Sequence, residues 1–193
     1  TFWATSAGNA PFENFREKYG ISYGDLQVAG TDERLTEETF RAARAARLLT
    51  AAFAMSDDDI DMSLTAPWVM IGSDAILERP HNNHPRSTGC FSRVLGHYVR
   101  DTRALTLESA IHKVTQMPAQ KLRIASRGVI EPGAFADLVA FDPETVGDRA
   151  TFDDPHQYPV GVPVVIVNGV VTLRDGEHTG DLGGRGVRGT PGR

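Results

Sequence analysis

The sequence contains a single cysteine and lacks both long apolar runs and any concentration of positive charge. Because one cysteine, Cys90, cannot form an intrachain disulfide, the composition fits a reducing compartment, and we expect the cytoplasm. No run of about 18 apolar residues occurs, so we expect no segment that spans a bilayer. The first residues also lack a basic stretch followed by an apolar one, which predicts no signal peptide.

The charge balance is acidic, with a formal net charge of -5. Nucleic-acid binding is therefore not favoured, because phosphate contacts need clustered Lys and Arg. Three arginines, Arg41, Arg44 and Arg47, recur at helical spacing, and this pattern is typical of a solvated helix face. With 193 residues, of which 40% are hydrophobic, we expect one domain, or one domain with a small appendage.

The first third of the chain predicts helices. Residues 12–19 read as a short helix that Gly20 closes. Residues 35–55, "LTEETFRAARAARLLTAAFAM", predict a longer helix with Thr36 as N-cap and two glutamates in the first turn, where the helix dipole favours anions. Ser56, followed by three aspartates, predicts the start of a second short helix before Pro67.

The middle of the chain has the pattern of an α/β protein. "PWVMIGSD", residues 67–74, is a short apolar run bounded by proline and glycine, which predicts a strand buried on both faces. Helices are predicted at 91–100 and at 106–124, the second with Thr106 as N-cap. The alternation of strand and helix favours a parallel sheet with helices around it.

From residue 126 onward the composition favours strands. Two segments rich in Val, Ile and Phe are punctuated by turn dipeptides, at 132–133, 142–143, 168–169 and 175–176. Asn168-Gly169 between two Val-rich runs predicts a β-hairpin. Residues 181–193 are rich in glycine, and we expect a frayed tail.

The strongest candidate site lies where the predicted strand ends. Asp74 follows the apolar run, and functional groups gather at the carboxyl ends of parallel strands. His81, His84 and Arg86 follow on one loop that two prolines stiffen. A carboxylate at a strand end beside such a loop indicates a site, although Asp74 could equally only cap a turn.

Several separate motifs, in order, resemble one family. They are "MIGSDA", "HPRSTGCFSRVLGHYVRD", "LTLESAIHKVTQMPAQKLRI", "RGVIEPGAFADLVAFDPETVGDRATFDDP" and "VVIVNGVVTLRDGEHTG". Together they resemble the carboxyl-terminal part of the N-acyl-D-amino-acid deacylases, or D-aminoacylases, of the amidohydrolase superfamily. The resemblance covers residues 51–180; "ADLVAFDP" and "VNG" indicate the superfamily, whereas the H-P-R loop and "ATFDDP" indicate the deacylases.

The resemblance implies a fold and a division of the chain. The fold class would be α/β, with the carboxyl-terminal part of a TIM-like (β/α) barrel at residues 1–125. Strands of a small β-sandwich domain would follow at 126–180, and a Gly-rich tail at 181–193. In the family, that small domain is built from both ends of the polypeptide.

The resemblance also implies roles for individual residues in a zinc-dependent hydrolysis of N-acyl-D-amino acids. Asp74 matches the aspartate that contacts zinc and transfers a proton, so it is expected to be both metal ligand and catalytic residue. Arg86 is the first candidate to bind the substrate carboxylate, because a guanidinium can hold it bidentately. Arg93 is the second candidate, and His84 would support the loop or the site. His112 is expected to be a helix-packing residue, and Cys90 a small buried thiol.

The family's other metal ligands are not found in this sequence. It has no H-x-H pair, and no histidine precedes His81. Since catalytic zinc uses about three protein ligands, Asp74 alone cannot hold it. The expectation is therefore a partner, an amino-terminal chain of the same enzyme that carries the H-x-H ligands. A fragment or a degenerate homologue is the alternative.

Two alternative functions, from other functional classes, stay open. Thr1 could be an amino-terminal nucleophile that chain cleavage creates, with its own α-amine as base. The chain could also be a non-catalytic interaction module that carries a β domain. Which N-acyl amino acid would be the substrate does not follow from the sequence; no nucleic-acid or membrane partner is expected.

Overall fold

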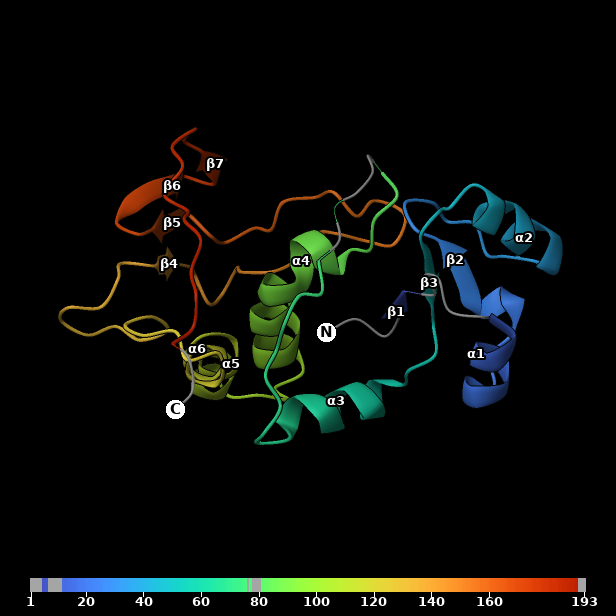
Figure 1. Ribbon diagram of the computed structural model, residues 1–193, viewed down its shortest axis with the longest axis horizontal. Coiled ribbons are helices and arrows are strands. Elements are labelled where there is room, and N and C mark those ends of the chain that lie inside the picture. The colour runs from blue at the N-terminus through green and yellow to red at the C-terminus, as the bar shows by residue number, and fades with distance from the viewer. Residues whose placement is uncertain (1–4, 7–11, 76, 78–80, 191–193) are drawn as a thin grey trace. The chain divides into compact units, whose positions relative to one another are not determined.

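The computed structural model describes residues 5–6, 12–75, 77 and 81–190, in two compact units (Figure 1). Unit 1 combines residues up to 63 with residues 73–90 and 148–158. Unit 2 combines residues 64–72, 91–147 and 159 onward. Both units contain helices and strands. The paired strands of the described residues are all antiparallel, so the parallel sheet that the sequence favoured is not found among them. The division at residues 125 and 180 stays a prediction. Within the described residues, no helix is long and apolar enough to cross a membrane.

Unit 1 is built on a small antiparallel sheet. Its strands are β1 (Thr5–Ser6), β2 (Leu26–Val28) and β3 (Thr50–Ala52), in the order β1-β3-β2. The helical elements of this part of the chain are α1 (Phe12–Tyr19), the single turn η1 (Tyr23–Asp25), α2 (Glu37–Ala45) and α3 (Asp57–Thr65). The core under the sheet joins Leu26 and Val28 to Leu35 and Phe40, so the apolar side of α2 covers β2.

The helix starts follow the predicted caps. Thr36 caps α2 by accepting the Thr39 N–H at 3.2 Å, and Ser56 caps α3 by accepting the Asp59 N–H at the same distance. Gly20 ends α1 with φ +64°. These contacts are local in sequence, which is why the composition revealed them.

The predicted helix over residues 35–55 is wrong in its second half. Helix α2 ends at Ala45, and Arg47 takes the left-handed φ of 53°. Residues 50–52 then form β3, the central strand of the sheet, and all three are buried. Strong helix formers are in a strand here because pairing and burial outweigh helix propensity.

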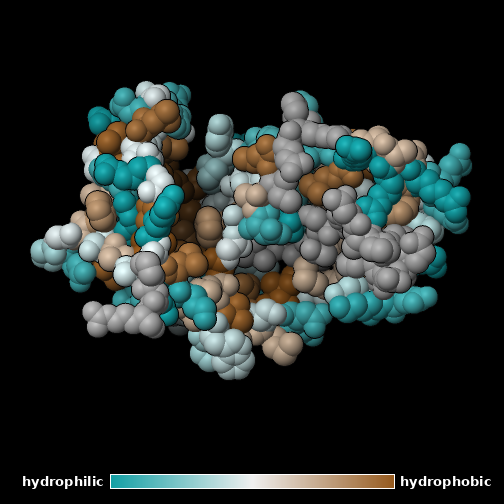
Figure 2. Space-filling model, in the orientation of Figure 1, coloured by the Kyte–Doolittle hydropathy of each residue, from teal (hydrophilic) through white to brown (hydrophobic). Residues whose placement is uncertain are grey.

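Unit 2 contains helices and a four-stranded antiparallel sheet in the order β4-β5-β6-β7. Its strands are β4 (Leu138–Ala140), β5 (Val164–Val167), β6 (Val170–Arg174) and β7 (Glu177–His178). Its helical elements are the π-helical segment η2 (Val94–Asp101), α5 (Leu107–Val114) and α6 (Gln116–Lys121). Helix α4 (Arg86–Arg93) precedes η2 in the chain and begins among the residues of unit 1. Figure 2 shows hydrophobic side chains at the surface over this sheet, where Val139 and Val170 are exposed.

The predicted hairpin is confirmed, but the frayed tail is not. Asn168 and Gly169 both have positive φ, 50° and 81°, and join β5 to β6 in the tight turn that Asn-Gly favours. In the tail, the Gly183 carbonyl accepts the Asn168 amide at 2.7 Å, and Thr190 N–H donates to Arg123 O at 2.9 Å. Both contacts fix the tail against the rest of unit 2.

The predicted buried strand over residues 67–72 is wrong. These residues, all of which the structure describes, form no strand, and Trp68 is 77% exposed. A strand needs a neighbouring ladder, and no described strand pairs with this segment. It rests instead on α5, where the buried Lys113 ammonium donates to the carbonyls of Ala66 at 2.5 Å and Val69 at 2.9 Å. The Ile71 N–H returns a bond to the Lys113 carbonyl at 3.2 Å.

Candidate functional site

The predicted loop of His and Arg residues lies in unit 1, between two fixed points. It begins at His81, which has a φ of 67°, and ends where Arg86 starts α4. At the start, the Asn82 side chain bonds to the main chain of Ala29 and Leu49. At the end, Pro85 is fully buried and its carbonyl accepts the Gly89 N–H at 2.9 Å, which closes the first turn of the helix.

His84 is a buried part of this loop. Its side chain is among the largest fully buried ones, with the residue 1% exposed. Nδ1 accepts the backbone N–H of Arg86 at 3.2 Å, and the ring meets Phe152 edge-on, 5.1 Å between centroids. Because Nδ1 is the acceptor, a neutral ring carries its proton on Nε2. The imidazole thus holds the backbone of Arg86, two residues later in the loop.

Asp74 and Arg86 form the charged pair of the site. Arg86 Nη2 lies 2.6 Å from Asp74 Oδ2, and Arg86 Nε donates to the Asp74 carbonyl at 3.0 Å. The two side chains differ in environment: the guanidinium is 11% exposed and the carboxylate 76%. Asp74 also takes a left-handed φ of 49°, which aspartate tolerates better than most residues. An outward carboxylate can accept hydrogen bonds or bind a cation.

The other residues singled out in the sequence are arranged differently. Arg93 belongs to unit 2, and its guanidinium carbon lies 5.9 Å from the centre of the Tyr98 ring. Cys90 is a buried thiol, as predicted. The packing role of His112 is wrong: it is exposed, and Nδ1 lies 3.1 Å from Gln116 Oε1. The next residue, Lys113, is the buried one.

Sequence reasoning missed the residues of 148–158 that pack against the loop. Phe152 contacts His84, and His156 Nε2 lies 2.7 Å from the Asn83 side-chain amide. The rings of His81 and His156 are 6.1 Å apart between centroids. The "ATFDDP" motif, residues 150–155, lies in this segment and is the available signal, because it is one of the two motifs that indicate the deacylases.

The described residues do not complete a metal site. Within them, no group of three or more His, Cys, Asp or Glu side chains is placed to hold a metal ion. Asp74 fits one carboxylate ligand of such a site, and His84, being buried and bonded through Nδ1, is not presented as another. Any metal held by Asp74 would therefore need ligands from elsewhere.

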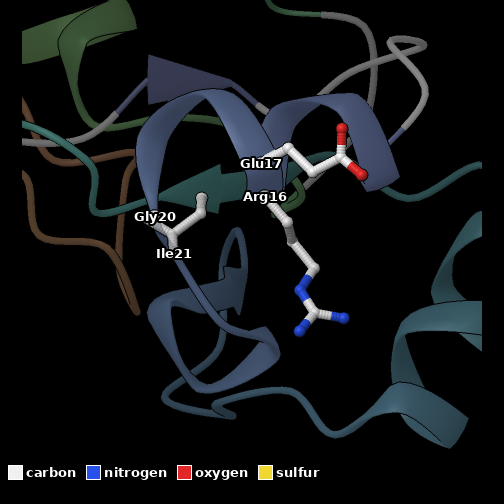
Figure 3. Close-up of a pocket in the computed structure, with 4 residues that line it drawn as sticks. All are labelled: Arg16, Glu17, Gly20 and Ile21. Atoms are coloured by element: carbon white, nitrogen blue, oxygen red, sulfur yellow. The ribbon is translucent and has the colours of Figure 1, made fainter.

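Two cavities of the described residues are lined by residues other than this pair. One of about 450 Å³ is lined by Arg16, Glu17, Gly20 and Ile21, and Figure 3 shows its two charged side chains pointing apart. The other, about 670 Å³, lies in unit 2 against α5 and the residues around β4, with largely apolar walls. A specific polar ligand needs convergent polar groups, and the first cavity does not offer them.

Comparison with known proteins gives consistent relatives. The model of the amidohydrolase family matches residues 23–173. A D-aminoacylase of Alcaligenes xylosoxydans xylosoxydans is 43% identical over 135 residues, which is 69% of this chain and 27% of that enzyme. An N-acyl-D-glutamate deacylase of the same organism is 44% identical over 132 residues, 66% of this chain and 27% of its own length.

Solved structures agree with the sequence comparison. The N-acyl-D-glutamate deacylase from Bordetella bronchiseptica, complexed with zinc and a phosphonate inhibitor that mimics the tetrahedral intermediate, has a TM-score of 0.73 at 36% identity. The likeness covers 89% of this chain and 38% of that one. A D-aminoacylase structure concerned with its binuclear metal centre has a TM-score of 0.74 at 33% identity, over 96% and 37% of the two chains. The chain thus spans little more than a quarter of the length of the curated relatives it matches.

Proposed function

Because the chain belongs to the amidohydrolase family, we propose that it supplies the proton-transferring carboxylate and part of the substrate site of a zinc-dependent N-acyl-D-amino-acid deacylase. The observation that carries this proposal is the Asp74–Arg86 pair, which joins the two residues expected to handle the proton and the substrate. The relatives support the reaction, since they are named for removing acyl groups from D-amino acids.

In this proposal Asp74 is both a metal ligand and the group that carries the proton. Bound zinc would act as a Lewis acid and lower the pKa of a water molecule to about 7. The Asp74 carboxylate, exposed and acceptor-only when ionised, would take the proton of the attacking water and deliver it to the leaving amine. Its outward position supports the role, because a proton carrier must reach the reacting atoms.

Arg86 would bind the carboxylate of the N-acyl amino acid. Its guanidinium pairs with a carboxylate already, through a single charge-assisted contact from Nη2 to Asp74 Oδ2. His84 would orient Arg86 through the hydrogen bond to its N–H, a supporting role. Arg93 remains the second candidate for the substrate carboxylate.

The remaining zinc ligands would lie on polypeptide outside these 193 residues, and a separate amino-terminal chain is part of the proposal. The fold would then be the end of a (β/α) barrel followed by strands of a β-sandwich, to which residues 1–125 and 126–180 would belong.

The test of the proposed function is the hydrolysis of N-acyl-D-amino acids by the zinc-loaded assembly of this chain with the polypeptide that carries the other zinc ligands. Asp74→Asn should lower kcat by roughly 100- to 10,000-fold, because the amide cannot carry the proton. Asp101→Asn is the matched control, since Asp101 is also an exposed aspartate paired with an arginine, at 2.8 Å from Arg100 Nε. Turnover by Asp74→Asn close to that of the control would contradict the proposal.

The partner is tested by native mass and metal analysis of the purified protein. A second polypeptide that carries zinc is expected; a metal-free species of 21.0 kDa would contradict a partner chain. The alternative nucleophile, Thr1, lies outside the described residues. Full activity of Thr1→Ala would eliminate that alternative.

A further inference from the structure

The Asn82 side chain forms three hydrogen bonds, all to main-chain atoms distant in sequence. Oδ1 accepts the Leu49 N–H at 2.6 Å, and Nδ2 donates to the Leu49 carbonyl at 3.1 Å and the Ala29 carbonyl at 2.7 Å. These partners lie just beyond the paired ends of β2 and β3. Asn82 thus pairs with the Leu49 peptide groups as a neighbouring strand residue would.

A second contact fixes the same point of the loop independently. Gly30, next to Ala29, has a φ of 84°, and a Cβ added to it would overlap the main-chain carbonyl of His81. The Gly30 N–H donates to the Phe152 carbonyl at 2.9 Å. The loop backbone therefore passes against the end of β2 with no room for a side chain between them.

The path from Asn82 to Arg86 is short and firmly held. Asn83 and His84 are 1% exposed, and His84 Nδ1 accepts the Arg86 N–H. A displacement of the loop at Asn82 has no exposed, flexible residue between 83 and 85 to absorb it. It would reach the Arg86 guanidinium, whose position sets the geometry of carboxylate binding.

We propose that Asn82 is a positioning residue that places the Arg86 guanidinium for the substrate carboxylate. The inference rests on the proposed function of Arg86 and adds to it a determinant in the same loop, four residues earlier in the chain. It connects the residues around β2 and β3 to substrate affinity. The proton transfer assigned to Asp74 does not pass through Asn82.

Two variants separate positioning from general stability. Asn82→Asp keeps the size and the acceptor but places an anionic oxygen against the carbonyls of Ala29 and Leu49; Asn82→Ala removes all three bonds. Asn168→Ala is the matched control, because the Asn168 side chain also bonds to distant groups, Arg127 and the Gly183 carbonyl, but in unit 2.

The experiment combines steady-state kinetics of the zinc-loaded assembly, formed with the polypeptide that carries the other zinc ligands, with amide hydrogen exchange. Both Asn82 variants should raise KM by roughly 10- to 100-fold and leave kcat within about twofold, as a misplaced binding group would. Exchange at residues 83–86 should become faster in both variants. Asn168→Ala should change neither KM nor this exchange, although it should lower the unfolding temperature.

Failure of this inference is distinguishable from failure of the proposed function. If Arg86→Lys raises KM but the Asn82 variants change neither KM nor exchange at 83–86, the positioning role is overturned and the proposed function stands. If Arg86→Lys leaves KM unchanged, the substrate role of Arg86 is overturned. A fall in kcat as large as that of Asp74→Asn, with KM unchanged, would also overturn positioning through Arg86.

Discussion

The loop at residues 81–86 in unit 1 and the turn at 168–169 in unit 2 are both held by an asparagine side chain. Asn168 is in a two-residue hairpin, and its positive φ is followed by that of Gly169. Asn82 contacts main chain 33 and 53 residues earlier. A local turn can be recognised from two adjacent residues, whereas hydrogen bonds from a side chain to distant main chain are visible only in the structure.

Glycines show the same contrast between the two regions. Gly30 and Gly169 have nearly the same φ, 84° and 81°. A Cβ at Gly30 would overlap the His81 carbonyl, whereas a Cβ at Gly169 would meet no described atom within 4 Å. The backbone conformation alone requires glycine in the hairpin, but close approach of two segments adds to that requirement at residue 30.

The largest expected effect is at Gly30, where the loop at residues 81–86 approaches the end of β2. Gly30→Ala should lower the free energy of unfolding by about 3 kcal/mol or more, because both the positive φ and a main-chain overlap oppose the methyl group. Chemical denaturation of the wild type and the variant measures this loss. An effect no larger than that of Gly169→Ala would remove the contrast between the two regions.

Lys113, which bonds to distant main chain, should rank next. Its buried ammonium bonds to carbonyls 44 and 47 residues away, so Lys113→Met leaves these carbonyls without it and should cost about 2 kcal/mol. The control is Lys121→Met on α6, where the lysine is exposed and the change should stay within about 0.5 kcal/mol. Equal unfolding midpoints for the two variants would contradict the role of Lys113.

The hairpin glycine should cost less. Gly169→Ala should lower the free energy of unfolding by about 1 kcal/mol, because only the positive φ opposes the new side chain. Gly176→Ala is a suitable comparison, since its φ of 82° and open surroundings are the same. A loss at Gly169 well above that at Gly176 would mean that the turn has tertiary constraints like those at Gly30.

The smallest expected effect is a pH dependence next to the hairpin. Burial alone would raise the pKa of Asp137, but hydrogen bonds from the Asn168 N–H and the Arg127 guanidinium outweigh it and hold that pKa below its ordinary value. A carboxyl with a lowered folded pKa stabilises the protein above its unfolded pKa of about 3.9, and this contribution is lost as pH falls through the folded value. Asp137→Asn should therefore flatten the loss of thermal stability below about pH 4. The same acid dependence in Asp137→Asn and wild type would contradict this, with the exposed Asp181→Asn as control.

Sequence reasoning succeeded where the contacts are local. The caps at Thr36, Ser56 and Thr106 and the hairpin at 168–169 depend on residues at most three positions apart. It failed at residues 50–52, where helix formers pair in a sheet, and at 67–72, where the expected strand has no described neighbour. Pairing between distant segments decided both cases.

The candidate site shows the same difference between local features, which the sequence indicates, and distant contacts, which it does not. Asp74 and Arg86 are 12 residues apart, and the sequence identified both because one apolar run and one loop contain them. Phe152 and His156 touch the loop across about 70 residues, and nothing local indicates that they would. The environment of the pair, an exposed carboxylate beside a buried guanidinium, likewise depends on packing that no motif encodes.

The Gly-rich carboxyl-terminal segment has a practical consequence for protein engineering. Its composition is that of a flexible spacer, yet Gly183 and Gly189 lie so close to the carbonyls of Val167 and Leu122 that any larger residue would collide with them. A version of the chain trimmed at residue 180 on composition alone would deprive the Asn168 amide of its acceptor. Because a Cβ at residue 183 or 189 would overlap one of these carbonyls, diversifying the two positions in a library should select strongly for glycine.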